Sequence, residues 1–224
     1  MKMILLITIV TIFTLFNFVE TKAQNQYEPC LPDCPNSNWS PPMNLPAFEV
    51  SIILCGKSFS VRYRTRVACG IWYDYYIESV GTDDNGDISN CIDDEYGDLN
   101  SFLQAATEQL MIINPANFPP HNIGDCETNW RVMNGSCFMI ESLTGPLNSK
   151  NKDNDLLYDP YSYHYSEFAI PCNSTDCCLE FFTVCIDTNG NRTITQTGYL
   201  PPEDPDCTGG GSMCEPVCGS IYNR

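Results

Sequence analysis

The sequence predicts an α+β fold with mainly antiparallel sheet, one principal helix packed on a face, disulfide staples and irregular Pro/Gly-rich termini. Residues 58–67 and 71–80 alternate apolar and polar side chains, and residues 101–113 repeat apolar side chains at helical spacing. Cysteines follow an apolar leader along the whole chain. The expected division is a signal peptide at 1–23, an extended Cys/Pro-rich lead-in at 24–47, an α+β domain at 48–200 and a Cys/Gly/Pro-rich tail at 201–224.

The first residues have the three parts of a secretory signal peptide. Lys2 precedes an apolar run from Ile4 to Val19, and the small residue Ala23 follows. The run is about 16 residues long, short of the ~20 that span a bilayer. We therefore expect cleavage after Ala23, secretion or display at the cell surface, and no transmembrane span in the mature chain. An uncleaved membrane anchor is the alternative.

Two strands are predicted next to each other. Ser58 to Val67 alternates almost without exception, and Ile71 to Val80 alternates again, with Ile71, Tyr73, Tyr75 and Ile77 on one face. One continuous strand over both segments would exceed roughly 70 Å. A break is therefore expected near Ala68-Cys69-Gly70.

The only strong helical pattern follows an expected acidic loop at 81–97. Ser101 has the residue type and position of an N-cap, and Asn114-Pro115 is predicted to end the helix. The helix has one apolar stripe, which predicts that it lies on a sheet. Residues 144–171 are polar and rich in tyrosine, which indicates a long loop.

Two Asn-Gly dipeptides predict tight hairpins, because both central residues of a type I′ turn need positive φ. Asn134-Gly135 is expected to join strands at 130–133 and 136–140. Asn189-Gly190 is expected to join strands on its two sides, and a two-residue loop there would place Asp187 opposite Arg192.

Cysteine usage predicts a disulfide framework. An even count of fourteen behind a leader indicates up to seven disulfides, whose pairing cannot be read from the sequence. Adjacent Cys177 and Cys178 on a strand point to opposite faces and should have different partners. Structural zinc is disfavoured, because there is no Cys-x-x-Cys and only His121 and His164 offer imidazoles. The cysteines are Cys30, Cys34, Cys55, Cys69, Cys91, Cys126, Cys137, Cys172, Cys177, Cys178, Cys185, Cys207, Cys214 and Cys218.

The charge is strongly negative, −17 with eleven Lys plus Arg, so nucleic acid is not an expected partner. Asp83, Asp84, Asn85 and Asp87 crowd oxygen ligands into one acidic stretch. Calcium bound there is one interpretation, although the spacing does not fit an EF-hand. Solvated turn chemistry explains the same residues. No cofactor is expected apart from this calcium alternative.

An arginine row, Arg62, Arg64 and Arg66, alternates along the first strand, so the three side chains share one face. One interpretation is a site for a carboxylated or sulfated ligand, because guanidinium groups bind such anions through forked hydrogen bonds. The other is that the row pairs with Asp74 and Glu78 on the next strand, as opposite charges commonly do across a sheet.

Trp72 and Tyr76 are predicted to share a face of the second strand. Exposed aromatic rings stack on sugars or anchor protein partners, so these residues and the arginine row together form a candidate ligand-binding face. The alternative is that the two rings belong to a second packed layer.

Three segments carry a resemblance. Arg66 to Asp74, Asn114 to Pro120 and the vicinal Cys177-Cys178 resemble a set of uncharacterised, cysteine-rich exported bacterial proteins. The resemblance implies a bacterial envelope or extracellular setting and transfers no site residues.

No catalytic signature is present, since the chain lacks Gly-x-Ser-x-Gly and His-Glu-x-x-His. The expectation is therefore an exported, non-catalytic extracellular or cell-surface protein with a structural or adhesive role. Its expected partners are an extracellular polysaccharide, a surface protein or a second copy. A carbohydrate- or anion-binding module is the first alternative, and a secreted hydrolase is the second.

Overall fold

The computed structural model describes residues 34, 37–82, 88–150, 156–172, 177–200, 207 and 213–218, with backbone only at 144–150 and 156–165. The leader, Cys30 and the stretch containing Asp83, Asp84, Asn85 and Asp87 lie outside the described residues. The elements are β1 (Phe48–Leu54), β2 (Lys57–Ala68), β3 (Trp72–Thr82), α2 (Ile88–Cys91), the π-helical η1 (Ile92–Tyr96), α3 (Leu99–Ile113), β4 (Cys126–Gly135), β5 (Cys137–Lys150), β6 (Leu156–Pro171), β7 (Cys177–Ile186), β8 (Arg192–Leu200) and β9 (Glu215–Pro216).

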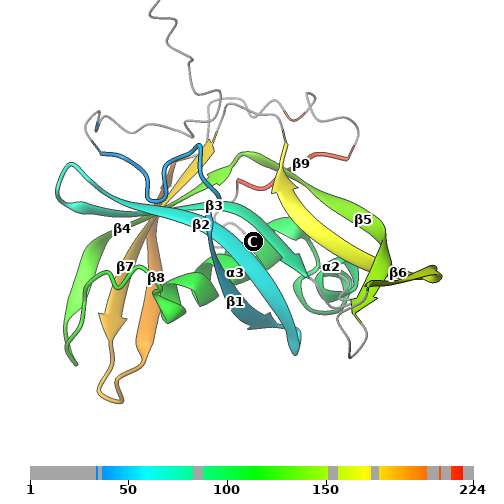
Figure 1. The fold of residues 1–224 in the computed structure, drawn as a ribbon. Coiled ribbons are helices and arrows are strands. Elements are labelled where there is room, and N and C mark those ends of the chain that lie inside the picture. Colours follow the sequence, from blue (N-terminus) through cyan, green and yellow to red (C-terminus); the bar gives the residue numbers. More distant parts are fainter. Residues whose placement is uncertain are drawn as a thin grey trace, which may run out of the picture.

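One sheet of nine strands branches at β3 (Figure 1). One edge of β3 pairs with β2, which pairs in turn with β1. The other edge pairs with β4 in parallel at Tyr73–Tyr76 and with β6 antiparallel at Val80–Thr82. Beyond β4 the sheet continues to β7 and β8, and beyond β6 it continues to β5 and β9. Both branches of the sheet therefore join at β3.

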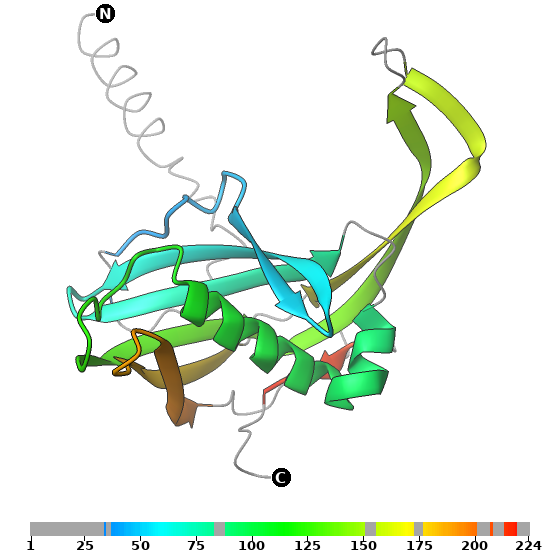
Figure 2. The same ribbon diagram turned by 90° about the horizontal axis from the view of Figure 1, so that it is seen from below.

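The predicted α+β fold with one principal helix packed on a face is wrong. The described chain is mostly strand, and the sheet curls into a half-barrel. The helix α3 lies inside the curl and contacts β1, β3 and β8, which are separated in the strand order (Figure 2). Register shifts in the β2–β3, β4–β7 and β7–β8 pairs explain the curl, because bulges increase the local twist of a strand. The apolar stripe of the helix is thus covered by a sheet that wraps around it.

The limits of α3 were partly predicted. Asp98, not Ser101, caps the helix, because its carboxylate accepts the Ser101 backbone N–H at 2.7 Å. The predicted end is confirmed. Asn114 adopts a left-handed conformation with φ of 50°, and its N–H donates to the Leu110 carbonyl.

The predicted hairpin at Asn134-Gly135 is wrong. Both residues belong to β4, which pairs with β3 and β7, whereas β5 pairs with β6 and β9. The glycine is needed for close packing and not for a turn. A Cβ on Gly135 would lie 3.0 Å from the Cβ of Pro171.

The second predicted hairpin, β7–β8, is confirmed, but its register differs by one residue. Ile186, not Asp187, lies opposite Arg192, so residues 187–191 form a longer loop. The Asp187 carboxylate accepts the backbone N–H groups of Asn189 and Asn191, each at 2.8 Å, and this bonding lowers the pKa of Asp187. The hydrogen bonds of Asp187 therefore stabilise a longer loop in place of the predicted two-residue turn.

Two predicted loops contain regular structure. Within 81–97, residues 88–96 are helical, with Ile88, Cys91 and Ile92 buried at helical spacing. Within 144–171, the backbone forms parts of β5 and β6, a long antiparallel ribbon that extends beyond the rest of the described chain (Figure 2). Two strands that bond mainly to each other need no buried face, so the sequence lacks the alternation that marked β2 and β3.

Disulfides tie each described segment to the sheet, and no described cysteine is free. Cys177 is also disulfide-bonded, and Cys178 bonds to Cys218, which confirms that these neighbours have different partners. Bonds of this number indicate an oxidising environment. None of the described helices is long and apolar enough to cross a membrane. The six described bonds are Cys34–Cys69, Cys55–Cys91, Cys126–Cys185, Cys137–Cys207, Cys172–Cys214 and Cys178–Cys218.

Candidate functional site at the arginine row

In the arginine row, Arg62 is exposed to solvent, whereas another segment of the chain covers Arg64 and Arg66. The side chain of Arg62 is 48% exposed and lies 4.0 Å from Glu49. Arg64 and Arg66 are only 4% and 3% exposed. Residues 37–45, which we call the strap, supply the polar groups that cover them.

Arg64 binds the strap through backbone carbonyls. Its Nη1 donates to the carbonyl oxygens of Pro41 at 2.9 Å and Pro42 at 2.6 Å, and its Nη2 donates to Leu45 at 2.8 Å. Its Nε forms an ion pair with Glu78. The forked donors that suggested a ligand site are therefore engaged by the chain itself.

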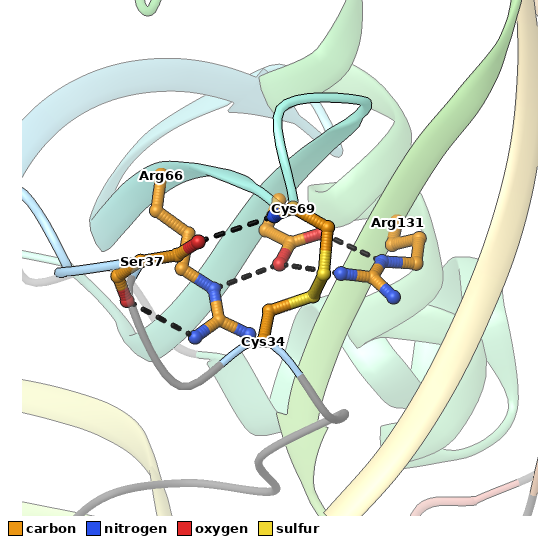
Figure 3. The surroundings of a disulfide bond; sticks show 6 residues. Cys34, Ser37, Arg66, Cys69 and Arg131 are labelled. Carbon is orange, nitrogen blue, oxygen red and sulfur yellow. Dashed lines mark hydrogen bonds and ion pairs between the residues drawn. A yellow bond between two sulfur atoms is a disulfide. The ribbon is translucent and has the colours of Figure 1, made fainter.

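Arg66 and Arg131, both labelled in Figure 3, belong to a buried charge cluster around Asp74. Asp74 is fully buried, and its Oδ2 accepts Arg66 Nε at 2.8 Å. Arg131 from β4 donates Nε to Oδ1 at 2.7 Å and Nη2 to Oδ2 at 2.8 Å. The carboxylate thus receives three charge-assisted hydrogen bonds from two guanidinium groups.

Tryptophan rings cover both arginines of this cluster. The guanidinium carbon of Arg66 lies 4.4 Å from the Trp39 ring centroid, and that of Arg131 lies 4.5 Å from the Trp72 ring centroid. These distances are within the range of cation–π attraction, which is stronger where water is excluded. The cluster therefore joins the strap, β2, β3 and β4 into one packed unit.

The strap is held by backbone pairing and by a covalent bond. Ser40 and Thr65 exchange two backbone hydrogen bonds, at 2.7 Å and 3.0 Å. Cys34 and Cys69 are disulfide-bonded, and the Ser37 hydroxyl accepts the Cys69 N–H at 3.1 Å. These contacts fix the strap across the turn between β2 and β3.

Both predicted aromatic residues lie in packed positions. Trp72 is half-buried with its ring centroid 5.9 Å from Phe181, and Tyr76 is half-buried 6.0 Å from Trp39. The structure therefore shows the packed-layer alternative for Trp72 and Tyr76. For Arg64 and Arg66 it shows pairing with acids of the next strand.

Sequence reasoning missed Arg131 and Trp39. Asp74 and Arg131 are register partners in the parallel β3–β4 pair, a contact between residues that are far apart in sequence. One signal was available, because Asp74 stands in a strand of aromatic and β-branched residues, where a carboxylate needs a partner.

Removing the strap disulfide tests how the strap is held. We expect Cys34→Ser with Cys69→Ser to lower the free energy of unfolding by about 2–4 kcal/mol, because the bond closes a long loop in the unfolded chain. Hydrogen exchange at the Ser40 and Thr65 amides should speed up. Replacing Cys126 and Cys185 with serine is the control, since it should leave those two amides protected. Unchanged exchange in the strap variant would contradict this assignment.

Metal chemistry is not indicated at the arginine row. Within the described ranges, no three His, Cys, Asp or Glu side chains gather as metal ligands. The two guanidinium groups of the cluster bind one carboxylate, and these contacts hold the strap on the sheet. No protein-family model, curated protein or solved structure matches this chain.

Proposed function

We propose that this is an exported, non-catalytic protein with a structural or adhesive role outside the cytosol. Two features support export. The leader has the sequence features of a signal peptide, and the described disulfides require an oxidising compartment to form and persist. The buried arginine–aspartate cluster and the disulfides make a body suited to persistence in a proteolytic medium, because both hold the segments that a protease would need to open.

The adhesive role rests on the projecting ribbon of β5 and β6. We call residues 142–150 and 156–166 the arm. The body pairs with β5 at Cys137–Phe138, through β9, and with β6 at Glu167–Ala169, through β3. Along the arm, the strand pairs are those between β5 and β6 themselves (Figure 2).

The base of the arm is fixed, whereas no described strand outside the arm pairs with its outer part. Cys137 and Cys172, which flank the arm, are bonded to Cys207 and Cys214 of the tail. An isolated two-stranded ribbon is marginally stable in water. A ribbon held at its base and extended from the body is therefore suited to pack against an external surface, which would supply the missing contacts.

The composition of the arm favours contacts that do not depend on a net charge. Its two strands carry one lysine, Lys150, and one aspartate, Asp159, for a formal charge of zero in a chain of −17. Four tyrosines occur in β6 within the arm, at positions 158, 161, 163 and 165. Tyrosine combines a large apolar ring with a hydroxyl group and is enriched in contacts with sugars and proteins. An extracellular polysaccharide or a surface protein fits these properties.

Removing the arm tests the proposal. Leu143 and Ser166 lie opposite each other, so an Asn-Gly turn can replace residues 144–165 without changing the register of the base. We expect the midpoint of denaturation to stay the same and binding of labelled protein to cells of the source organism, or to their secreted polysaccharide, to fall at least tenfold.

Ile53→Ser is the matched control, because Ile53 is an exposed apolar residue of β1, outside the arm. It should bind like the wild type. If the variant without the arm binds as well as the full chain, the arm is not the adhesive element and the proposed role loses its main support.

A further inference from the structure

The inner face of β7 carries a buried carboxyl group next to α3. Glu180 is 2% exposed and is one of the largest fully buried side chains. It lies between Val132 of β4 and Tyr199 of β8, its register partners. No described Lys or Arg lies within ion-pair distance of it, in contrast to Asp74. Glu180 is thus a buried acid whose charge the described residues leave uncompensated.

A second carboxyl group lies near Glu180. Glu108 of α3 is near enough for its negative charge to oppose ionisation of Glu180. Glu108 itself is exposed, so the pair extends from the protein interior to the surface. Two neighbouring carboxylates without a cation create a local field that attracts positive charge.

An unpartnered amide lies on the same inner face. Gln196 of β8 is 9% exposed, and neither its Oε1 nor its Nε2 has a hydrogen-bond partner among the described residues. Gln196 lies opposite Phe182, two residues along β7 from Glu180, so the Glu180 and Gln196 side chains are directed to the same side of the sheet. Buried polar groups in native proteins are almost always satisfied by protein, water or an ion. The Gln196 amide is thus a second buried polar group on this face that needs a partner from outside the described residues.

We propose that Glu180, Glu108 and the Oε1 of Gln196 bind a hard divalent cation of the calcium type between α3, β7 and β8. All three ligands are oxygens, as calcium prefers, and two carboxylates balance its charge. Water completes the coordination on the side of Glu108. This site is separate from the acidic stretch at 83–87 and does not depend on the proposed adhesive role.

The cation would tie the helix to the β7–β8 hairpin. The helix α3 contacts β8, and Arg192 of β8 donates to the Ile112 carbonyl at 3.4 Å near the end of α3. A cation between Glu108 and Glu180 would add a second link, between α3 and β7. The affinity expected of an extracellular site of this type is about 10⁻⁴–10⁻³ M.

The test is calorimetric titration of the chelator-treated full chain with Ca²⁺ at pH 7.5, together with thermal unfolding in 10 mM Ca²⁺. We expect millimolar or tighter binding and a rise in Tm of about 3–5 °C. Glu180→Gln should abolish that rise, and Gln196→Glu, which adds a carboxylate, should tighten binding about tenfold.

Glu49→Gln is the control, because it removes an exposed carboxylate on β1 and should keep the wild-type response. Any calcium bound at 83–87 would persist in Glu180→Gln, which separates the two sites. The proposal is overturned if wild-type Tm is independent of Ca²⁺. It is also overturned if folded Glu180→Gln responds like the wild type or if Gln196→Glu leaves the affinity unchanged.

Discussion

Replacing Asp74 with asparagine is expected to lower the free energy of unfolding by about 3–5 kcal/mol, the usual cost of leaving a buried charge without its partner. The carboxylate accepts hydrogen bonds from Arg66 and Arg131, and all three side chains are buried. Asparagine keeps the shape but removes the negative charge, so two guanidinium groups would face each other without compensation. Guanidinium chloride denaturation of the oxidised protein measures the change.

Glu49→Gln provides the matched carboxylate-to-amide control. Glu49 pairs with Arg62 at 4.0 Å, and both side chains are about half exposed, so solvent screens the pair. Its loss should change the free energy of unfolding by less than about 1 kcal/mol. An Asp74→Asn variant as stable as this control would show that the cluster does not hold the strap and sheet together.

Glu180→Gln is expected to have the opposite effect and to stabilise the protein at neutral pH in the presence of a chelator. Burial, followed by the nearby Glu108, raises the pKa of Glu180 from 4.5 to about 7 in the folded state. At pH 8 the folded protein must hold a desolvated carboxylate, at a cost of about 3 kcal/mol relative to the unfolded chain. Glutamine removes that cost because it has no charge.

The pH dependence has a definite sign. Below about pH 4.5, Glu180 is protonated in both folded and unfolded states and has no linkage effect. As the pH rises toward 7, the unfolded chain loses this proton while the folded chain keeps it, so wild-type stability falls and then levels off. The advantage of Glu180→Gln should grow over the same interval. An advantage that is the same at pH 4 and pH 8 would contradict the assignment, and Glu141→Gln at an exposed position serves as the control.

The parts of the fold that were predicted correctly depend on contacts close in sequence. Alternation in β2 and β3 fixes which side chains share a face, and a turn at Cys69-Gly70 then places Arg66 opposite Asp74. The pairing of the arginine row with acids could be anticipated because both partners lie on one hairpin. The β7–β8 hairpin was found for the same reason, and only the capping side chain of Asp187 changed its register.

The parts that were missed depend on contacts between distant segments. The Asn134-Gly135 dipeptide has turn chemistry, but pairing of β4 with both β3 and β7 keeps it extended. The same parallel pairing brings Arg131 to Asp74, and no local pattern marks that register. The curl of the sheet arises from bulges whose positions alternation does not reveal. It is this curl that places α3 inside a half-barrel instead of on a flat layer.

Non-reducing peptide mapping by mass spectrometry would show whether covalent links hold the strap, the tail and the base of the arm to one sheet. We expect peptides joined through Cys34–Cys69, Cys55–Cys91, Cys126–Cys185, Cys137–Cys207, Cys172–Cys214 and Cys178–Cys218. Free thiols at these positions in the native protein, or a different set of linked peptides, would contradict it.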